Sequence, residues 1–164
     1  MRKLMSILLL FIFPILLFAK EPLDAGSKFL NFEINRATLI SGGYFLQDWL
    51  VIQAGIGFAV NRETETNGFA VKLGVDQYLD AGKISPFAGG YVRFDINPDA
   101  FGETYWEGSR FVFGGHWGLT YFLLQDLSIT GTIGTEFQFN SPKNMDSSTN
   151  FTTFTSGVQI RFYF

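Results

Sequence analysis

The segment from Phe151 to Phe164 alternates between apolar and polar side chains and ends on an aromatic residue. Because successive side chains of a β-strand point to opposite sides, this alternation sorts the segment into two faces. One face carries Phe154, Ser156, Val158, Ile160, Phe162 and Phe164, and the other carries Thr153, Thr155, Gly157, Gln159, Arg161 and Tyr163. The first face suits hydrocarbon and the second suits water, which is typical of a strand in a closed transmembrane barrel.

The same period of two recurs along the chain, and no window competes with it at the helical period. The segments that show it are 28–36, 38–47, 49–60, 68–79, 84–96, 109–122, 127–139 and 151–164. Short connections at 47–48, 80–82 and 125–126 alternate with longer polar ones near 61–67, 97–108 and 140–150. Short turns on one rim and longer loops on the other are the arrangement of outer-membrane barrels. We therefore predict an all-β chain that folds as an eight-stranded antiparallel up-and-down transmembrane β-barrel.

The N-terminus predicts export. Arg2 and Lys3 precede an apolar run from Leu4 to Ala19, after which the sequence turns polar. This is the layout of a cleavable secretory signal peptide over 1–19, with the barrel domain over 20–164; the alternative is an uncleaved N-terminal anchor. No later run approaches about 18 apolar residues, so any membrane crossing must be made by strands. Cysteine is absent, which excludes disulfides, thiolate metal sites and lipid attachment through cysteine.

The amino-acid composition argues against some classes of binding partner and favours contact with lipid. The chain has 15 acidic and 12 basic residues, and removal of Arg2 and Lys3 with the signal peptide makes it more acidic. That balance argues against nucleic-acid binding. Aromatic residues make up 18% of the chain and charged residues only 16%. A soluble protein surface is ordinarily about a quarter to a third charged, so the composition favours a membrane-facing exterior over a soluble, lipocalin-like barrel.

The polar face of the strands carries charges of both signs among small residues. Besides the single histidine, it holds four acids and four bases: Glu33, Lys72, Asp76, Arg93, Asp95, Arg110, His116, Glu136 and Arg161. In an eight-stranded barrel the interior is just wide enough for side chains, and balanced charges can pair across it. We predict that these residues form a charge-paired network in a filled interior, which argues against a general porin. A narrow channel for small or hydrophobic solutes is the alternative.

No motif predicts a catalytic residue, a cofactor or a metal. His116 stands alone among histidines, and Gly115-His-Trp-Gly offers no nucleophile beside it. No Ser/His/Asp spacing, phosphate-binding loop or carboxylate pair stands out. We therefore predict that the protein is not an enzyme.

Aromatic residues precede the short turns. Tyr44-Phe-Leu-Gln-Asp-Trp-Leu50 is echoed by Tyr121-Phe-Leu-Leu-Gln-Asp-Leu127. We expect an aromatic girdle at this rim, joined by Trp49 and the terminal Tyr163-Phe164. The alternative is that these residues only form cross-strand aromatic pairs.

Three stretches carry a family resemblance: Gly42-Gly-Tyr-Phe45 with its Gln-Asp turn, Pro86-Phe-Ala-Gly-Gly-Tyr91, and Val158-Gln-Ile-Arg-Phe-Tyr-Phe164. With them the chain resembles the small eight-stranded outer-membrane β-barrel proteins of the OmpX and OmpA-transmembrane-domain type. The resemblance implies a barrel in the outer membrane, where its contacts are lipid and lipopolysaccharide; the sequence does not give the oligomeric state, and a monomer is favoured. It also implies insertion by the barrel-assembly machinery, through a signal formed by Val158, Ile160, Phe162 and Phe164.

The activity stays open, because the group includes adhesion-related, structural, small-solute and enzymatic members. A structural or surface-interaction role in the cell envelope is the expectation. A narrow channel and, further off, a lipid A-modifying enzyme are the alternatives.

Overall fold

The structure is a computed structural model that describes residues 22–34, 39–63, 65–102, 104 and 106–164. The predicted signal peptide, residues 1–19, lies outside the described residues. Eight strands follow one another along the chain: β1 (Lys28–Ile34), β2 (Leu39–Gln47), β3 (Leu50–Asn61), β4 (Thr66–Tyr78), β5 (Ile84–Ile96), β6 (Gly108–Leu124), β7 (Leu127–Pro142) and β8 (Ser148–Tyr163). A short 3₁₀ helix, η2 (Pro98–Phe101), stands between β5 and β6. Within the described residues, no helix has the length and hydropathy that a membrane span requires.

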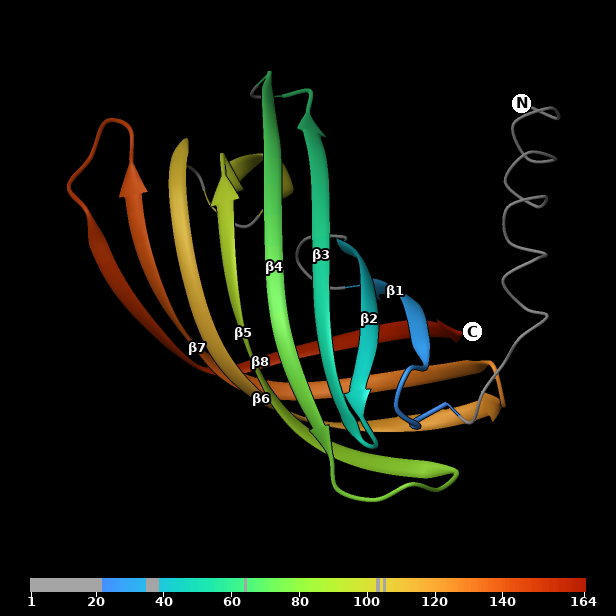
Figure 1. The fold of residues 1–164 in the computed structure, drawn as a ribbon. Helices are drawn as coiled ribbons and strands as arrows, with labels where there is room; N and C mark the ends of the chain where they lie inside the picture. Colours follow the sequence, from blue (N-terminus) through green and yellow to red (C-terminus); the bar gives the residue numbers. More distant parts are fainter. Residues whose placement is uncertain (1–21, 35–38, 64, 103, 105) are drawn as a thin grey trace, which may run out of the picture.

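The strands form one closed barrel in which each pairs with its neighbours in sequence (Figure 1). The first and last strands close the wall, with antiparallel pairing that runs from Phe29 opposite Tyr163 to Ile34 opposite Val158. Every other neighbouring pair is also antiparallel. The predicted eight-stranded up-and-down barrel is confirmed. We call the end with the short connections after β2, β4 and β6 the turn end, and the opposite end the loop end.

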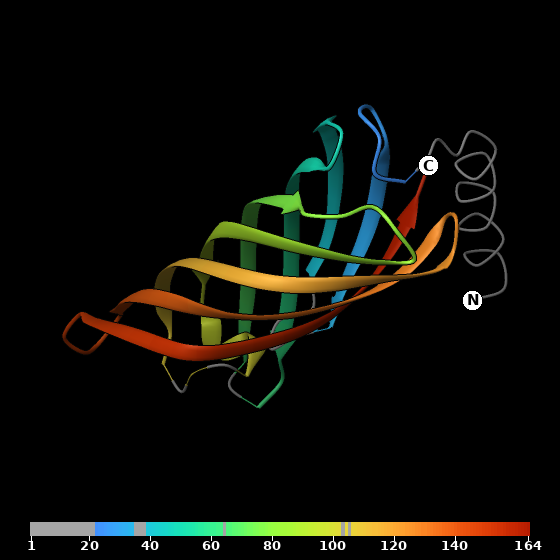
Figure 2. The same cartoon turned by 90° about the horizontal axis from the view of Figure 1, so that it is seen from below.

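The wall is uneven in height. β6, β7 and β8 have 17, 16 and 16 residues, whereas β1 and β2 have 7 and 9. Figure 1 shows β1 and β2 stopping below the level that β3 and β4 reach, and in Figure 2 the β7–β8 hairpin projects past the neighbouring strands. Most of the predicted loop over 140–150 is therefore strand, because the ladder continues to the pair of Asn140 and Ser148.

A register irregularity changes which residues of β8 face inward. Gly134 pairs with Thr155 and Glu136 pairs with Thr152, so β8 has one extra residue here. Such a bulge shifts the alternation by one position. Thr153, expected on the inner face, is exposed, whereas Thr152 is half-buried.

The outer surface of the barrel is apolar and its interior polar. Trp117 is 63% exposed and Phe58 is 72% exposed, whereas Arg110 and Asp95 are 3% and 0% exposed. Alternating side chains on the same strands thus separate a hydrocarbon-like exterior from a charged interior, as the sequence predicts. Tyr44, Trp49 and Tyr121 lie outward at the turn end, as expected for a girdle there.

Tyr163 was wrongly expected at the girdle. It is 1% exposed, and its ring lies 5.6 Å from that of Phe29 inside the barrel. It belongs to a packed cluster at the turn end that contains Leu23, Phe29, Phe45, Val51, Tyr78, Phe87 and Tyr163. The backbone N–H of Trp49 donates to the carbonyl oxygen of Leu23 at 2.9 Å, so the segment before β1 is held at this end. The turn end is therefore closed by side chains.

Candidate functional site: the barrel interior

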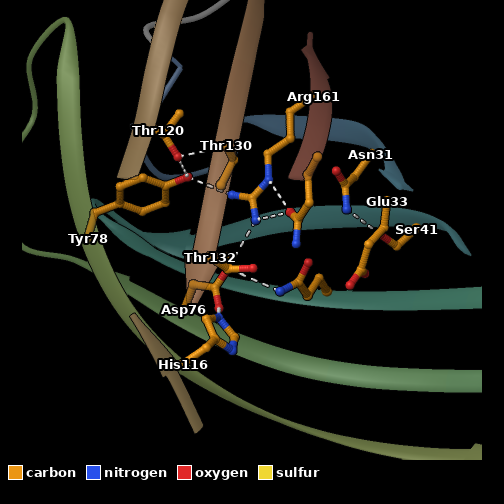
Figure 3. A network of polar contacts seen from close by, with 12 residues as sticks. Asn31, Glu33, Ser41, Asp76, Tyr78, His116, Thr120, Thr130, Thr132 and Arg161 are labelled. Atoms are coloured by element: carbon orange, nitrogen blue, oxygen red, sulfur yellow. Dashed lines mark hydrogen bonds and ion pairs between the residues drawn. The ribbon is translucent and has the colours of Figure 1, made fainter. Parts of the chain in front are cut away.

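Arg161 of β8 is at the centre of the interior polar contacts and is fully buried (Figure 3). Its Nη1 donates to the Tyr78 hydroxyl at 2.6 Å, and its Nη2 donates to Asp76 Oδ2 at 3.2 Å and to Gln159 Oε1 at 2.8 Å. Its guanidinium carbon lies 4.7 Å from the ring centroid of Phe29, within the range of a cation–π contact. Arg161 thus connects the aromatic cluster at the turn end with the charged groups that lie toward the loop end.

Asp76 of β4 receives hydrogen bonds from several strands. Its Oδ1 lies 2.8 Å from His116 Nε2, and Gln53 Nε2 donates to its Oδ2 at 3.0 Å. With Arg161, these contacts connect β3, β4, β6 and β8 across the barrel. A buried carboxylate with several such donors is held in one place, because losing any of them leaves a charge under-compensated.

Three further ion pairs lie closer to the loop end. Lys72 Nζ contacts Glu33 at 2.8 Å, which joins β4 to β1. Asp95 accepts from Arg110 at 2.7 Å and from Arg93 at 2.6 Å. Three of the four acids predicted for the interior are therefore in contact with predicted bases.

In the part of the chain that the structure describes, Glu136, the fourth interior acid, has no basic partner of the kind that the other three acids have. Tyr91 donates its hydroxyl proton to Glu136 Oε2 at 2.7 Å, and Gln138 Nε2 donates to Oε1 at 2.8 Å. Both partners are neutral, and among the described residues no basic side chain forms an ion pair with Glu136. The structure thus places all nine predicted residues on the inner wall; seven of them form ion pairs, His116 is bonded to Asp76, and Glu136 has neutral partners.

The neutral partners were not predicted. Tyr78, Tyr91, Gln53, Gln138 and Gln159 complete the contacts of the charged residues. The alternation of side chains along the strands could have identified them, because each stands at a position that faces the barrel interior. Thr120 and Thr130 extend the chain of contacts, with their hydroxyl oxygens 2.9 Å apart and the former 3.2 Å from Tyr78.

A cavity of about 380 Å³ occupies the loop-side half of the interior. Glu33, Lys72, Tyr91, Arg93, Arg110, His116, Thr132, Glu136 and Gln159 line it, together with Leu39, Val112, Phe154, Thr155 and Ser156. The predicted filled interior is right for the turn-side half and wrong for the loop-side half. The physical reason is that the buried cluster of aromatic rings lies at the turn end, whereas small side chains such as Thr132 and Thr155 leave room at the other.

The connection after β5 folds back toward the barrel. Asp99 in η2 is 5% exposed and accepts a hydrogen bond from the Thr66 hydroxyl at 2.7 Å. A Cβ at Gly68 would lie 2.8 Å from that of Ala100, so the glycine allows η2 to approach β4.

Within the described residues no group of three His, Asp or Glu side chains could hold a metal ion.

The comparisons with known proteins give fold likenesses only. The crystal structure of the N-terminal β-barrel domain of Pseudomonas aeruginosa OprF is similar to 85% of this chain and 98% of its own, with a TM-score of 0.51 and 15% identity. A major outer membrane protein from Thermus thermophilus gives a TM-score of 0.37 at 13% identity, over 84% of this chain and 99% of that one. No protein-family profile and no curated protein matches. The chain therefore has the fold of a small outer-membrane β-barrel, with an apolar exterior and a charged interior.

Proposed function

We propose that this protein is a non-enzymatic, non-conducting barrel of the outer membrane with a structural or surface-interaction role in the cell envelope. It is exported by its signal peptide, inserted by the barrel-assembly machinery, and resides as a monomer among lipid and lipopolysaccharide. The fold likeness and the apolar exterior support the location.

The closed turn end is the observation that carries the proposal. Phe29, Phe45, Tyr78, Phe87 and Arg161 are each no more than 1% exposed, and they come from five different strands. Arg161 is held there by Asp76 and Tyr78. Breaking a buried ion pair costs about 3–5 kcal/mol, so this layer favours a closed state. A solute that entered the loop-side cavity would meet a packed barrier.

Current recordings in planar lipid bilayers test whether the packed turn end closes the barrel to ions. We expect refolded wild-type protein to give no stepwise currents. Phe87→Ala, which removes a ring from the barrier, is the matched variant in which stepwise currents should appear. Stepwise single-channel currents from the wild-type protein would reject closure and favour the narrow-channel alternative.

The environment of His116 supports a non-enzymatic role. Its Nε2 is bonded to Asp76 inside the barrel, and its ring lies 5.7 Å from that of Phe87. A lipid-modifying enzyme needs its reacting groups within reach of the leaflet. Mass analysis of lipid A from cells that overproduce the protein tests this directly, and a change in acylation that requires His116 would overturn the proposal.

A further inference from the structure

A shallow apolar groove lies on the outer face of the wall near the turn end. Gly42 and Ala54 pair across β2 and β3 and form its floor, with Leu73 of β4 beside them. Tyr44 and Ile52, which also pair with each other, border it on the side nearer the turn end. The groove has a volume of about 570 Å³ and opens onto the apolar exterior of the barrel.

The groove is open because no side chain fills the space above Gly42. The nearest atom that a Cβ at Gly42 would meet is the carbonyl oxygen of Phe29, at 3.8 Å, which is an ordinary contact. Gly42 is not among the glycines with positive φ, so a larger residue would stand here without backbone strain. At Gly43, in contrast, a Cβ would collide with the Phe29 ring inside the barrel. Packing of the wall therefore requires the second glycine but not the first, and the space above Gly42 is available to a ligand.

Lys28 gives the groove a cationic end. It is the first residue of β1, lines the groove and stands opposite Tyr44 in the strand register. Its side chain is exposed, and among the described residues no acidic side chain forms an ion pair with it. Lysine and tyrosine side chains at the boundary between membrane and water are placed to contact lipid headgroups. The groove thus combines an apolar floor with a positive charge at its turn-end side.

We propose that this groove binds one anionic phospholipid of the inner leaflet, with its phosphate at Lys28 and an acyl chain over Gly42 and Ala54. The short turns of outer-membrane barrels face the periplasm, so the turn end lies in the leaflet that faces the periplasm. The phosphate pairs with the Lys28 ammonium beside Tyr44, and the chain fills the space that Gly42 leaves open. The inference deepens the proposed contact with outer-membrane lipid, on which it rests, and does not depend on closure of the turn end.

Charge and shape together select this class of ligand. A zwitterionic headgroup brings an ammonium group of its own close to that of Lys28, whereas an anionic headgroup does not. Inorganic phosphate would meet the charge of Lys28 but would leave the apolar surface of Ile52 and Leu73 uncovered. An anionic phospholipid satisfies both ends of the groove.

NMR titration of the refolded protein in uncharged detergent micelles tests the proposal. The probes are phosphatidylglycerol and phosphatidylcholine with the same acyl chains. The signal is the Ala54 methyl group, and the Ala88 methyl group of β5, outside the groove, is the reference. We expect saturable shifts of Ala54 alone, at one site per barrel, with phosphatidylcholine binding about fivefold more weakly than phosphatidylglycerol.

Two lysine variants test the role of charge. Lys28→Gln should weaken the binding of phosphatidylglycerol about fivefold and leave that of phosphatidylcholine unchanged, because it removes the charge and keeps most of the side chain. Lys83→Gln is the matched control, since Lys83 also lies at the turn end but outside the groove, with its Nζ 5.5 Å from the ring centroid of Tyr121. This control should bind both lipids as the wild-type protein does.

Two glycine variants test the role of the groove. Gly42→Val fills the space above the floor and leaves Lys28 in place, so it should abolish the saturable shift of Ala54. Gly131→Val adds the same side chain at a glycine of β7 whose Cβ would meet no atom within 4 Å, and it should leave the shift unchanged. Both variants should still give the heat-modifiable band of a folded barrel.

Several outcomes would overturn the proposal. They are the absence of a saturable Ala54 shift in the wild-type protein, equal affinity for the two lipids, and unchanged binding by Lys28→Gln or by Gly42→Val. Shifts of Ala54 that follow protein concentration without added lipid would assign the groove to a second copy of the chain and would also overturn it. Contact of the barrel with the membrane is tested separately, by quenching of Trp117, which lies outside the groove.

Discussion

Arg161 and Asp76 lie 85 positions apart in the sequence and are in contact across the barrel, with Arg161 Nη2 donating to Asp76 Oδ2 at 3.2 Å. Both side chains are fully buried. This contact links the last strand to the fourth, so it forms only when the barrel has closed.

Removing one partner of this contact should destabilise the barrel strongly. In Arg161→Met, the Asp76 carboxylate stays buried without its guanidinium, and we expect a loss of about 3–5 kcal/mol in the free energy of unfolding. The double variant Arg161→Met/Asp76→Asn should lose clearly less than the sum of the two single variants. Urea unfolding followed by tryptophan fluorescence measures all three, and strictly additive losses would show that the two residues are not coupled.

Charge substitutions on neighbouring residues of β7 should separate the two faces. Ile133 is 53% exposed on the outer surface, whereas Thr132 lines the cavity. We expect Ile133→Arg to cost about 2–4 kcal/mol if the residue lies near the bilayer midplane, and Thr132→Arg to cost less. Folded yield in lipid vesicles, read on a heat-modifiability gel, compares them. A larger defect in Thr132→Arg would contradict the assignment of faces.

Packing at the turn end should be sensitive to added volume. A Cβ at Gly43 would collide with the ring of Phe29, whereas a Cβ at Gly131 meets no atom within 4 Å. We expect Gly43→Ala to lose about 1–3 kcal/mol in the free energy of unfolding, because the Phe29 ring must move within a packed cluster. Gly131→Ala is the control and should be near neutral in the same unfolding measurement. Equal stabilities would show that the cluster is loosely packed.

The strand fold and its two faces could be predicted because they follow from a local rule. An alternation of period two fixes which side of a strand each residue faces, and it placed Arg161 and Asp76 on the same side of the wall. It fails at Thr153, where one extra residue in β8 shifts the alternation, and no sequence signal marks the bulge. Tyr163 was assigned to the girdle by residue type although the alternation pointed it inward, as the structure shows.

The contacts inside the barrel could not be predicted in the same way. Which acid meets which base depends on the register and curvature of strands far apart in sequence, so a balance of four acids and four bases did not reveal that Asp95 contacts two arginines. It also did not reveal that Glu136 has only neutral partners. The cavity could not be predicted either, because its position depends on where large side chains from different strands come together.

The terminal strand should matter more for assembly in cells than for stability. The backbone of Phe164 exchanges hydrogen bonds with Lys28 at 2.9 and 3.1 Å, and these do not depend on the side chain. We predict that Phe164→Ser lowers the amount of folded barrel in cells several-fold, because the assembly signal is impaired. The variant refolded in detergent should unfold at nearly the wild-type urea concentration. A matching loss in both measurements would show that Phe164 acts through stability alone.

Fluorescence quenching by brominated lipid tests the central claim, that the apolar face of the barrel contacts hydrocarbon and the charged face does not. Trp117 is 63% exposed on the outer face, and Val112 is 2% exposed on the inner face of the same strand. Two single-tryptophan proteins are compared: one that keeps only Trp117, and one that carries Val112→Trp with the three native tryptophans replaced by phenylalanine. Bromines along the acyl chains should quench Trp117 strongly and the tryptophan at position 112 weakly. Equal quenching of the two, or stronger quenching at position 112, would contradict the account.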